Sequence, residues 1–172
     1  KARNILRLIF RTSLNQNKPY GSLCTKEHYD VAKVIGDESI VLLRNNGILP
    51  LQADKYNRIL VVGDNAVRRL TDGGGSSELK PKDMISPLDA LRALYGDKIE
   101  YTQGYACGRP FFGHEEEMQQ TVIVSLRAEA VAKARQADVV IYVGGLNKNA
   151  FQDCESTDRK SYNLPFSQNE LI

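Results

Sequence analysis

Residues 138–164 read DVVIYVGGLNKNAFQDCESTDRKSYNL, and this stretch decides the fold. Its apolar run, Val139 to Val143, has the length and the β-branched content of a buried strand, and Gly144-Gly145 ends it. An acidic segment, Gln152 to Arg159, follows. In a parallel α/β sheet, ligands bind at the loops that leave the carboxyl ends of the strands. We therefore expect function in this loop.

Further apolar runs, separated by helical patterns, predict more strands and helices between residue 138 and the amino terminus. Ser86-Pro87-Leu88-Asp89 is a helix start with a Ser cap, Pro at the first helical position and Asp placed to complete a capping box. Strand, loop, helix and strand in this order are typical of the βαβ unit of a parallel sheet, so an α/β fold is predicted. The further predicted strands cover residues 40–43, 58–62 and 99–102. The predicted helices cover residues 26–39, the segment from Ser86 to a stop at Gly96, and residues 125–136. In the first of these helices Thr25 is the cap, and Val31, Ala32 and Ile35 are on the buried side.

The composition excludes several classes of protein. The 172 residues are enough for one domain with a core, but not comfortably for two. With 23 basic and 21 acidic residues, no basic block stands out that would indicate nucleic-acid binding. No apolar run approaches the roughly 18 residues of a membrane helix.

Cysteine and histidine give no metal or cofactor signal. Cys24, Cys107 and Cys154 are odd in number and far apart, so neither a disulfide framework nor a metal motif is indicated. His28 and His114 have no third ligand at metal-like spacing. We predict that the protein binds no metal and no other cofactor.

Two loops are candidates for ligand contact. Gly73-Gly74-Gly75 precedes Ser76-Ser77, and three consecutive glycines favour a close approach of the backbone to a ligand. A phosphate cradle and a flexible surface loop are the alternatives. The P-loop spacing is missing, and we prefer the interpretation of a glycine-rich wall beside a bound ligand. In the second loop, Asp153, Glu155 and Asp158 lie within six residues and Arg159 follows. These are either solvated charges with an Asp158–Arg159 surface contact or a site in which Glu155 carries a proton.

The two ends of the chain have a different character from its middle. Residues 2–10 carry a helical pattern, and we interpret residues 1–11 as the end of a preceding domain. Residues 12–24 are rich in Ser, Asn, Pro and Gly and are predicted to be a linker. Residues 25–172 form the α/β domain, which we expect to be cut at its carboxyl terminus, just as a new helix begins.

Several stretches in order resemble one family. Residues 38–45 with Leu49-Pro50-Leu51, the strand 59–63, the loop 73–76, the strand 139–143, and residues 153–159 followed by Leu164-Pro165 and 168–172 are similar to the C-terminal domain of family 3 glycoside hydrolases, the β-glucosidase and β-xylosidase group. The resemblance covers nearly the whole chain.

The resemblance implies a mostly parallel sheet sandwiched between helices, placed after a TIM-like barrel. In such enzymes the barrel supplies an aspartate nucleophile and this domain supplies a glutamate general acid/base, which falls on Glu155 here. Residues 1–11 are then the last helix of the barrel, and the nucleophile lies outside this sequence. Ser76, Asp158 and Arg159 are the expected substrate-binding or loop-shaping residues. Relatives commonly have glycine where Ser156 stands.

Retaining glycoside hydrolysis uses two carboxyl groups roughly 5 Å apart, one as nucleophile and one as acid/base. The acid must keep its proton, so its pKa has to be raised; Asp153 and Asp158 would raise it and Arg159 would oppose them.

Three functions are therefore carried forward. The first is that the chain is part of a retaining β-glycosidase, most simply a β-glucosidase, with β-xylosidase as the alternative. Its substrate would be a carbohydrate, and its partner would be the barrel domain of the same chain. The second is a nucleotide-binding α/β module in which Gly63-Asp64 and the glycine loop hold a phosphate. The third is a non-catalytic carbohydrate-binding domain. The resemblance also implies a periplasmic or secreted protein.

Overall fold

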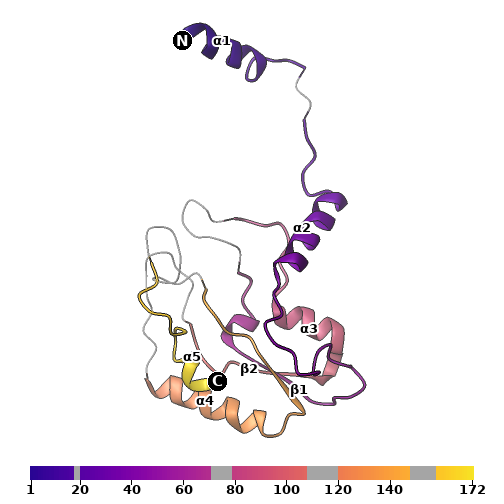
Figure 1. Cartoon of the computed structure of the whole chain (residues 1–172), viewed down its shortest axis with the longest axis vertical. Helices are drawn as coiled ribbons and strands as arrows, with labels where there is room; N and C mark the ends of the chain where they lie inside the picture. Colours follow the sequence, from indigo (N-terminus) through magenta and orange to yellow (C-terminus); the bar gives the residue numbers. More distant parts are fainter. Residues whose placement is uncertain (18–19, 71–78, 108–119, 148–157) are drawn as a thin grey trace. The chain divides into compact units, whose positions relative to one another are not determined.

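The computed structural model describes residues 1–17, 20–70, 79–107, 120–147 and 158–172 (Figure 1). The chain divides into two compact units, Lys1–Leu49 and Pro50–Ile172. Its elements in order are α1 (Ala2–Arg11), α2 (Lys26–Ser39), β1 (Ile59–Val62), η1 (Asp64–Ala66), α3 (Pro87–Tyr95), η3 (Gly96–Lys98), β2 (Ile99–Thr102), α4 (Gln120–Ala134), β3 (Val139–Tyr142) and α5 (Gln168–Leu171).

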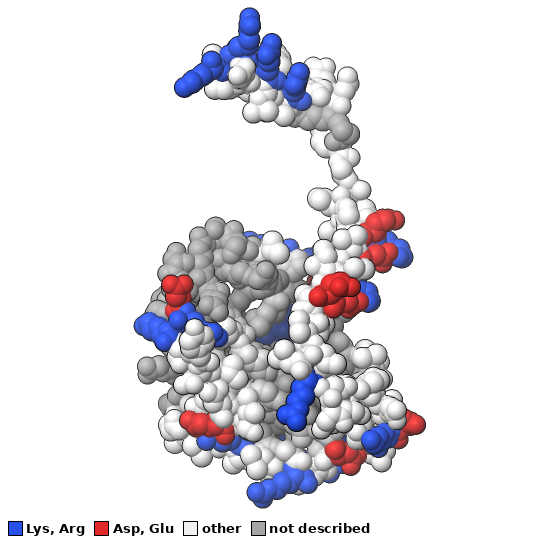
Figure 2. Space-filling view, viewed as in Figure 1, with Lys and Arg blue, Asp and Glu red and all other residues white. Residues whose placement is uncertain are grey.

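The first unit contains α1 and α2. Thr25 caps α2 as predicted: its hydroxyl accepts from the N–H of His28, whose ring in turn accepts from the N–H of Thr25. The side of α2 that was predicted to be buried is exposed, with Val31 at 58% and Ile35 at 64%. Basic side chains gather on α1 (Figure 2), where Lys1, Arg3, Arg7 and Arg11 lie among apolar residues.

The strand predicted at residues 40–43 is wrong. These residues form no strand, and Leu43 is 93% exposed. An apolar run becomes a strand only where its backbone N–H and C=O groups find a neighbouring strand to pair with. Within the described residues, the sheet contains β1, β2 and β3 alone, so this run has no such neighbour.

The sheet of the second unit is parallel, with strand order β2-β1-β3. Ile59 pairs with Ile99 on one side and with Val139 on the other, so the three strands start level and end level. The strands predicted at 58–62, 99–102 and 139–143 are confirmed to within one residue. Because β1 lies in the middle, all four of its residues are buried.

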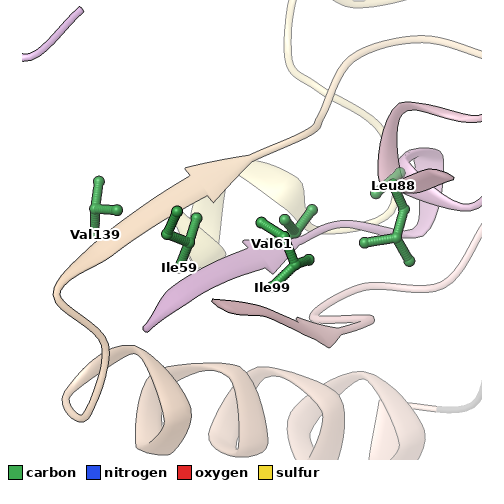
Figure 3. Packing of buried hydrophobic residues seen from close by; sticks show 6 residues of the cluster. Ile59, Val61, Leu88, Ile99 and Val139 are labelled. Carbon is green, nitrogen blue, oxygen red and sulfur yellow. The ribbon is translucent and has the colours of Figure 1, made fainter. Parts of the chain in front are cut away.

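One face of the sheet packs against α3. Ser86 caps this helix and Asp89 completes the capping box, as predicted. The buried side chains on this face come from alternate residues of the strands together with Leu88, and Figure 3 shows them side by side. They are Ile59, Val61, Ala66, Leu88, Ile99 and Val139.

The opposite face packs against α4, which begins earlier than the predicted residue 125. Leu60 and Val62 of β1 meet Ala130 here, with Ala134 and Leu171 beside them. The small alanines let the helix approach the sheet closely. A mostly parallel sheet between helices, the predicted fold class, is therefore confirmed.

None of the helices in the described ranges is long and apolar enough to cross a membrane.

Candidate functional site

Two of the four predicted site residues lie outside the described residues. Glu155 belongs to the undescribed segment 148–157 and Ser76 to 71–78. Ser156, which stands where relatives commonly have glycine, and the glycines 73–75 lie outside as well. Asp158 and Arg159 are described, the first exposed and the second half-buried.

The parallel register places the starts of three loops at one edge of the sheet. After β1 come Gly63 to Ala66, after β2 come Gln103 to Cys107, and after β3 come Val143 to Asn147. Each of these stems leads along the chain toward one of the segments 71–78, 108–119 and 148–157. The candidate site is therefore this carboxyl edge of the sheet, where ligands bind in folds of this kind.

Asp64 is the charged centre of the edge. It is only 5% exposed, and its carboxylate accepts hydrogen bonds from Arg68 Nε (2.8 Å), Gln103 Nε2 (3.0 Å) and the backbone N–H of Cys107 (3.0 Å). A buried carboxylate is tolerated only when it is paired and hydrogen-bonded. Asp64 therefore joins the stem after β1 to the stem after β2.

Asn65 makes the corresponding link to the stem after β3. Its side-chain amide donates to the carbonyls of Gly145 (3.4 Å) and Leu146 (3.3 Å). Its backbone N–H donates to the hydroxyl of Tyr105, which in turn donates to the carbonyl of Val143 at 2.8 Å. Two consecutive residues, Asp64 and Asn65, thus hold all three stems together.

Gly63 allows β1 and β3 to end this close to each other. Its φ is 137°, and a Cβ atom built on it would lie 2.1 Å from the carbonyl oxygen of Val143. Only glycine combines this backbone conformation with this contact.

The thiol of Cys107 and the hydroxyls of Tyr105 and Tyr142 stay protonated. Burial raises the pKa of the Cys107 thiol, and the nearby carboxylate of Asp64 raises it further. Burial also raises the pKa of the Tyr105 hydroxyl, and raises that of Tyr142 to about 12. Cys107 is therefore no nucleophile, because the thiolate is the reactive form. Both tyrosines act as hydrogen-bond donors.

Asp158 and Arg159 line a small polar hollow of about 280 Å³ with Lys160, Ser161 and Tyr162. The guanidinium of Arg159 lies 5.5 Å from the centre of the Tyr162 ring. A carboxylate acceptor, a guanidinium donor and an exposed aromatic ring are groups that bind sugar hydroxyls and apolar sugar faces. This segment follows directly on the one that contains Glu155.

A second hollow, of about 180 Å³, is apolar. It lies between α4 and β3 and is lined by residues such as Ala134, Val140 and Leu171. It offers few polar atoms to a sugar. Among the residues that the structure covers, no group of three or more His, Cys, Asp or Glu side chains could hold a metal ion.

Sequence reasoning missed most of this edge. It noted Asp64 as a possible phosphate-loop residue, but not Asn65, Tyr105, Asn147 or Gln168. The available signal was position: Asp64 and Asn65 follow the predicted strand at 58–62 after one glycine, and Gln103 follows the predicted strand at 99–102 directly. The alternative in which Gly63-Asp64 and the glycine loop hold a phosphate stays a prediction, because residues 71–78 lie outside the described residues.

Comparison with known proteins agrees with this architecture. The model of the glycosyl hydrolase family 3 C-terminal domain matches residues 40–172. A relative named β-glucosidase BoGH3A, from Bacteroides ovatus, is 55% identical over 100% of this chain and 24% of its own length. An exo-α-(1→6)-L-arabinopyranosidase from Bifidobacterium breve is 33% identical over 84% of this chain and 18% of its own length.

A solved structure of a GH3 β-glucosidase from Bifidobacterium adolescentis superimposes with a TM-score of 0.71 at 31% identity. The superimposed region covers 97% of this chain and 22% of the solved chain. The chain thus spans about a quarter of the length of these relatives or less. The chain belongs to glycosyl hydrolase family 3, and residues 40–172 correspond to that family's C-terminal domain.

Proposed function

We propose that this chain is part of a retaining β-glycosidase, with a β-glucosidase as the simplest case, and that Glu155 is the general acid/base. The similarity to BoGH3A along the whole chain is the observation that carries the proposal. A carbohydrate is the substrate, and a terminal β-linked sugar is released from it. β-Xylosidase is the nearest alternative, and the arabinopyranosidase relative means that the sugar has to be measured.

The proposed chemistry needs two carboxyl groups. The nucleophile is an aspartate of the barrel domain whose last helix is residues 1–11, and it attacks the anomeric carbon. Glu155 first protonates the departing oxygen and later takes a proton from the attacking water. Residues 1–172 alone are expected to be inactive, because one of the two carboxyl groups is absent.

Two observations in the described residues support the assignment of the two carboxyl groups to two different domains. The stem Val143–Asn147 leaves the carboxyl edge of the sheet directly before the segment that contains Glu155. In the first unit, α1 exposes apolar side chains, with Ile5 at 59% and Leu6 at 52%. Such a helix is expected to pack on another domain, as the proposed barrel requires.

Asp158 and Arg159 are proposed to shape the hollow that they line and to bind sugar hydroxyls, with Ser76 on the glycine loop as a further contact. The charge of Asp158 favours the protonated form of Glu155, while Arg159 favours the ionised form.

The test uses the full-length protein and a series of aryl β-glucosides with good and poor leaving groups. Glu155→Gln should lower kcat/KM by about 100- to 10,000-fold for poor leaving groups and much less for activated ones, since activated groups leave without a proton. Glu129→Gln, an exposed glutamate on α4, is the matched control and should behave as the wild type. Equal losses of Glu155→Gln on both kinds of substrate would contradict an acid/base role.

The same assay separates the sugars. Comparing 4-nitrophenyl β-glucoside with β-xyloside identifies the preferred substrate by the higher kcat/KM. A full-length protein without activity on any aryl glycoside would favour the non-catalytic carbohydrate-binding function.

A further inference from the structure

Gln168, the first residue of α5, makes an unusual set of contacts. Its side chain is fully buried. Its Oε1 accepts hydrogen bonds from the backbone N–H of Gly145 (2.8 Å) and from the hydroxyl of Tyr142 (3.0 Å), and its Nε2 donates to the carbonyl of Gly145 (3.0 Å). One carboxamide therefore satisfies both backbone groups of a single residue.

The backbone at Gly144 and Gly145 is shaped for this contact. A Cβ atom on Gly144 would lie 2.2 Å from the Tyr142 ring and 2.7 Å from Gln168 Oε1. Gly145 has a φ of 119°, which other residues rarely adopt. Asn65 donates a further hydrogen bond to the same Gly145 carbonyl.

The contact ties the two ends of one loop together. Residues 146–167, which we call the tied loop, leave the sheet after Gly145 and return at Gln168; of these, the structure describes 146–147 and 158–167. Asp158 and Arg159 lie in its described part, and Glu155 belongs to the same loop. Gly145 and Gln168, which flank the tied loop, are thus joined at one buried point.

The tie to Gly145 depends on the carboxamide of Gln168. A buried amide costs free energy unless every polar atom is bonded, whereas an apolar side chain of similar shape fills the same space without that requirement. The specific pairing with Gly145 is what an apolar residue could not provide.

We propose that Gln168 is a positioning residue for the glycosidase reaction: through Gly145 it holds the tied loop, and thereby the acid/base Glu155. This inference rests on the proposed function. Gln168 itself does not contact the reacting atoms.

The first variant is Gln168→Met in the full-length protein, which keeps the approximate shape and removes the hydrogen bonds. Because a displacement of about 1 Å of a catalytic group costs on the order of 100-fold in rate, kcat should fall about 10- to 100-fold for poor leaving groups. For activated leaving groups the loss should stay below about threefold, and KM should change little.

The second variant, Gln168→Glu, adds a pH signature. An ionised carboxylate cannot donate to the Gly145 carbonyl and repels it, whereas the protonated form donates and accepts as the amide does. Burial raises the pKa of such a carboxyl, so protonation occurs within the assay range. Activity relative to wild type should therefore recover as the pH falls, a recovery that Gln168→Met should not show.

Val139→Ala is the control for lost stability. Val139 is buried at the opposite end of β3, and its truncation weakens the core without touching the tied loop. Its leaving-group dependence should match that of the wild type. If Gln168→Met shows the same uniform behaviour as Val139→Ala while Glu155→Gln shows the acid/base pattern, the positioning role is overturned and the proposed function stands. If Glu155→Gln lacks that pattern, the proposed function fails and the inference fails with it.

Discussion

The two ends of the same sheet are held by different kinds of group. At the amino end, the exposed Asp138 accepts from the N–H groups of Asn57 (2.8 Å) and Arg58 (2.9 Å), and Arg58 pairs with Glu100. At the carboxyl end, Asp64 and Gln168 are buried, and each makes several hydrogen bonds. Exposed pairs contribute little to stability, while buried polar groups are costly to leave without partners.

The difference shows which end is specialised. The amino end joins strands, and its groups are in contact with water. The carboxyl end joins loops, and it does so with buried side chains that any slight movement would leave unsatisfied. Changes at the carboxyl end should therefore alter both stability and the position of the loops, whereas changes elsewhere should alter stability alone.

Asp64→Ala should have the largest effect on stability. It leaves the largely buried guanidinium of Arg68, 16% exposed, without its carboxylate, and removing one partner of a buried ion pair costs about 3–5 kcal/mol. Differential scanning calorimetry of the full-length protein measures the loss in Tm of this domain. Asp97→Ala, an exposed aspartate in η3, is the matched control; an equal Tm for the two variants would contradict the ion-pair account.

Leu60→Ala should be nearly as destabilising but functionally silent. Leu60 is 1% exposed and packs toward α4, so its truncation costs about 2–5 kcal/mol. Under conditions where the protein stays folded, its leaving-group dependence should equal that of the wild type. Leu94→Ala, on the exposed side of α3, is the control for the truncation itself. A selective loss with poor leaving groups would show that the core and the edge are not separable.

Asn65→Ala should have an intermediate effect. The carbonyls of Leu146 and Gly145 each lose the side-chain donor Asn65, while Gln168 still donates to Gly145, so the cost is about 1–3 kcal/mol. Amide hydrogen exchange over residues 143–147 should accelerate relative to wild type. Asn57→Ala, which removes an exposed asparagine side chain at the amino end, should leave this exchange unchanged. Unchanged exchange in Asn65→Ala would mean that Asn65 does not hold the stem.

Asp138→Asn should have the smallest effect, and only above acidic pH. Hydrogen bonds from the N–H groups of Arg58 and then Asn57 lower the pKa of Asp138 below its usual 3.8. The stabilisation is therefore present above pH 3.8 and is lost as the pH falls through the lowered pKa. In urea unfolding, wild type and variant should differ slightly at pH 7 and converge as the pH falls through the lowered pKa of Asp138. A difference that grows toward acidic pH would contradict the assignment.

Local patterns in the sequence predicted much of the fold. The runs at 59–62 and 139–142 became strands because each has a parallel neighbour, and Ser86 with Asp89 fixed the start of α3. Residues 40–43 have the same apolar character but no pairing neighbour in the described chain, and composition alone cannot reveal that.

The residues of the candidate site were less predictable from the sequence than the strands and helices. The acidic loop singled out Glu155, Asp158 and Arg159. The family resemblance supplied their roles and added Ser76, and these roles stay predictions. Asp64, Asn65 and Gln168 were not predicted as a group, because their contacts join residues about 40 to 80 positions apart or span the tied loop. Such contacts follow from strand order and register, which no local pattern contains.

The most direct test of the central claim, that Glu155 is the acid/base of a retaining β-glycosidase, is product analysis of full-length Glu155→Ala with azide. With an activated aryl β-glucoside, azide can enter from the face that the missing carboxylate leaves open, because it attacks without a general base. The account predicts restored turnover and a β-glucosyl azide product. A Glu155→Ala variant with wild-type kinetics, or one whose rate and product do not respond to azide, would contradict it.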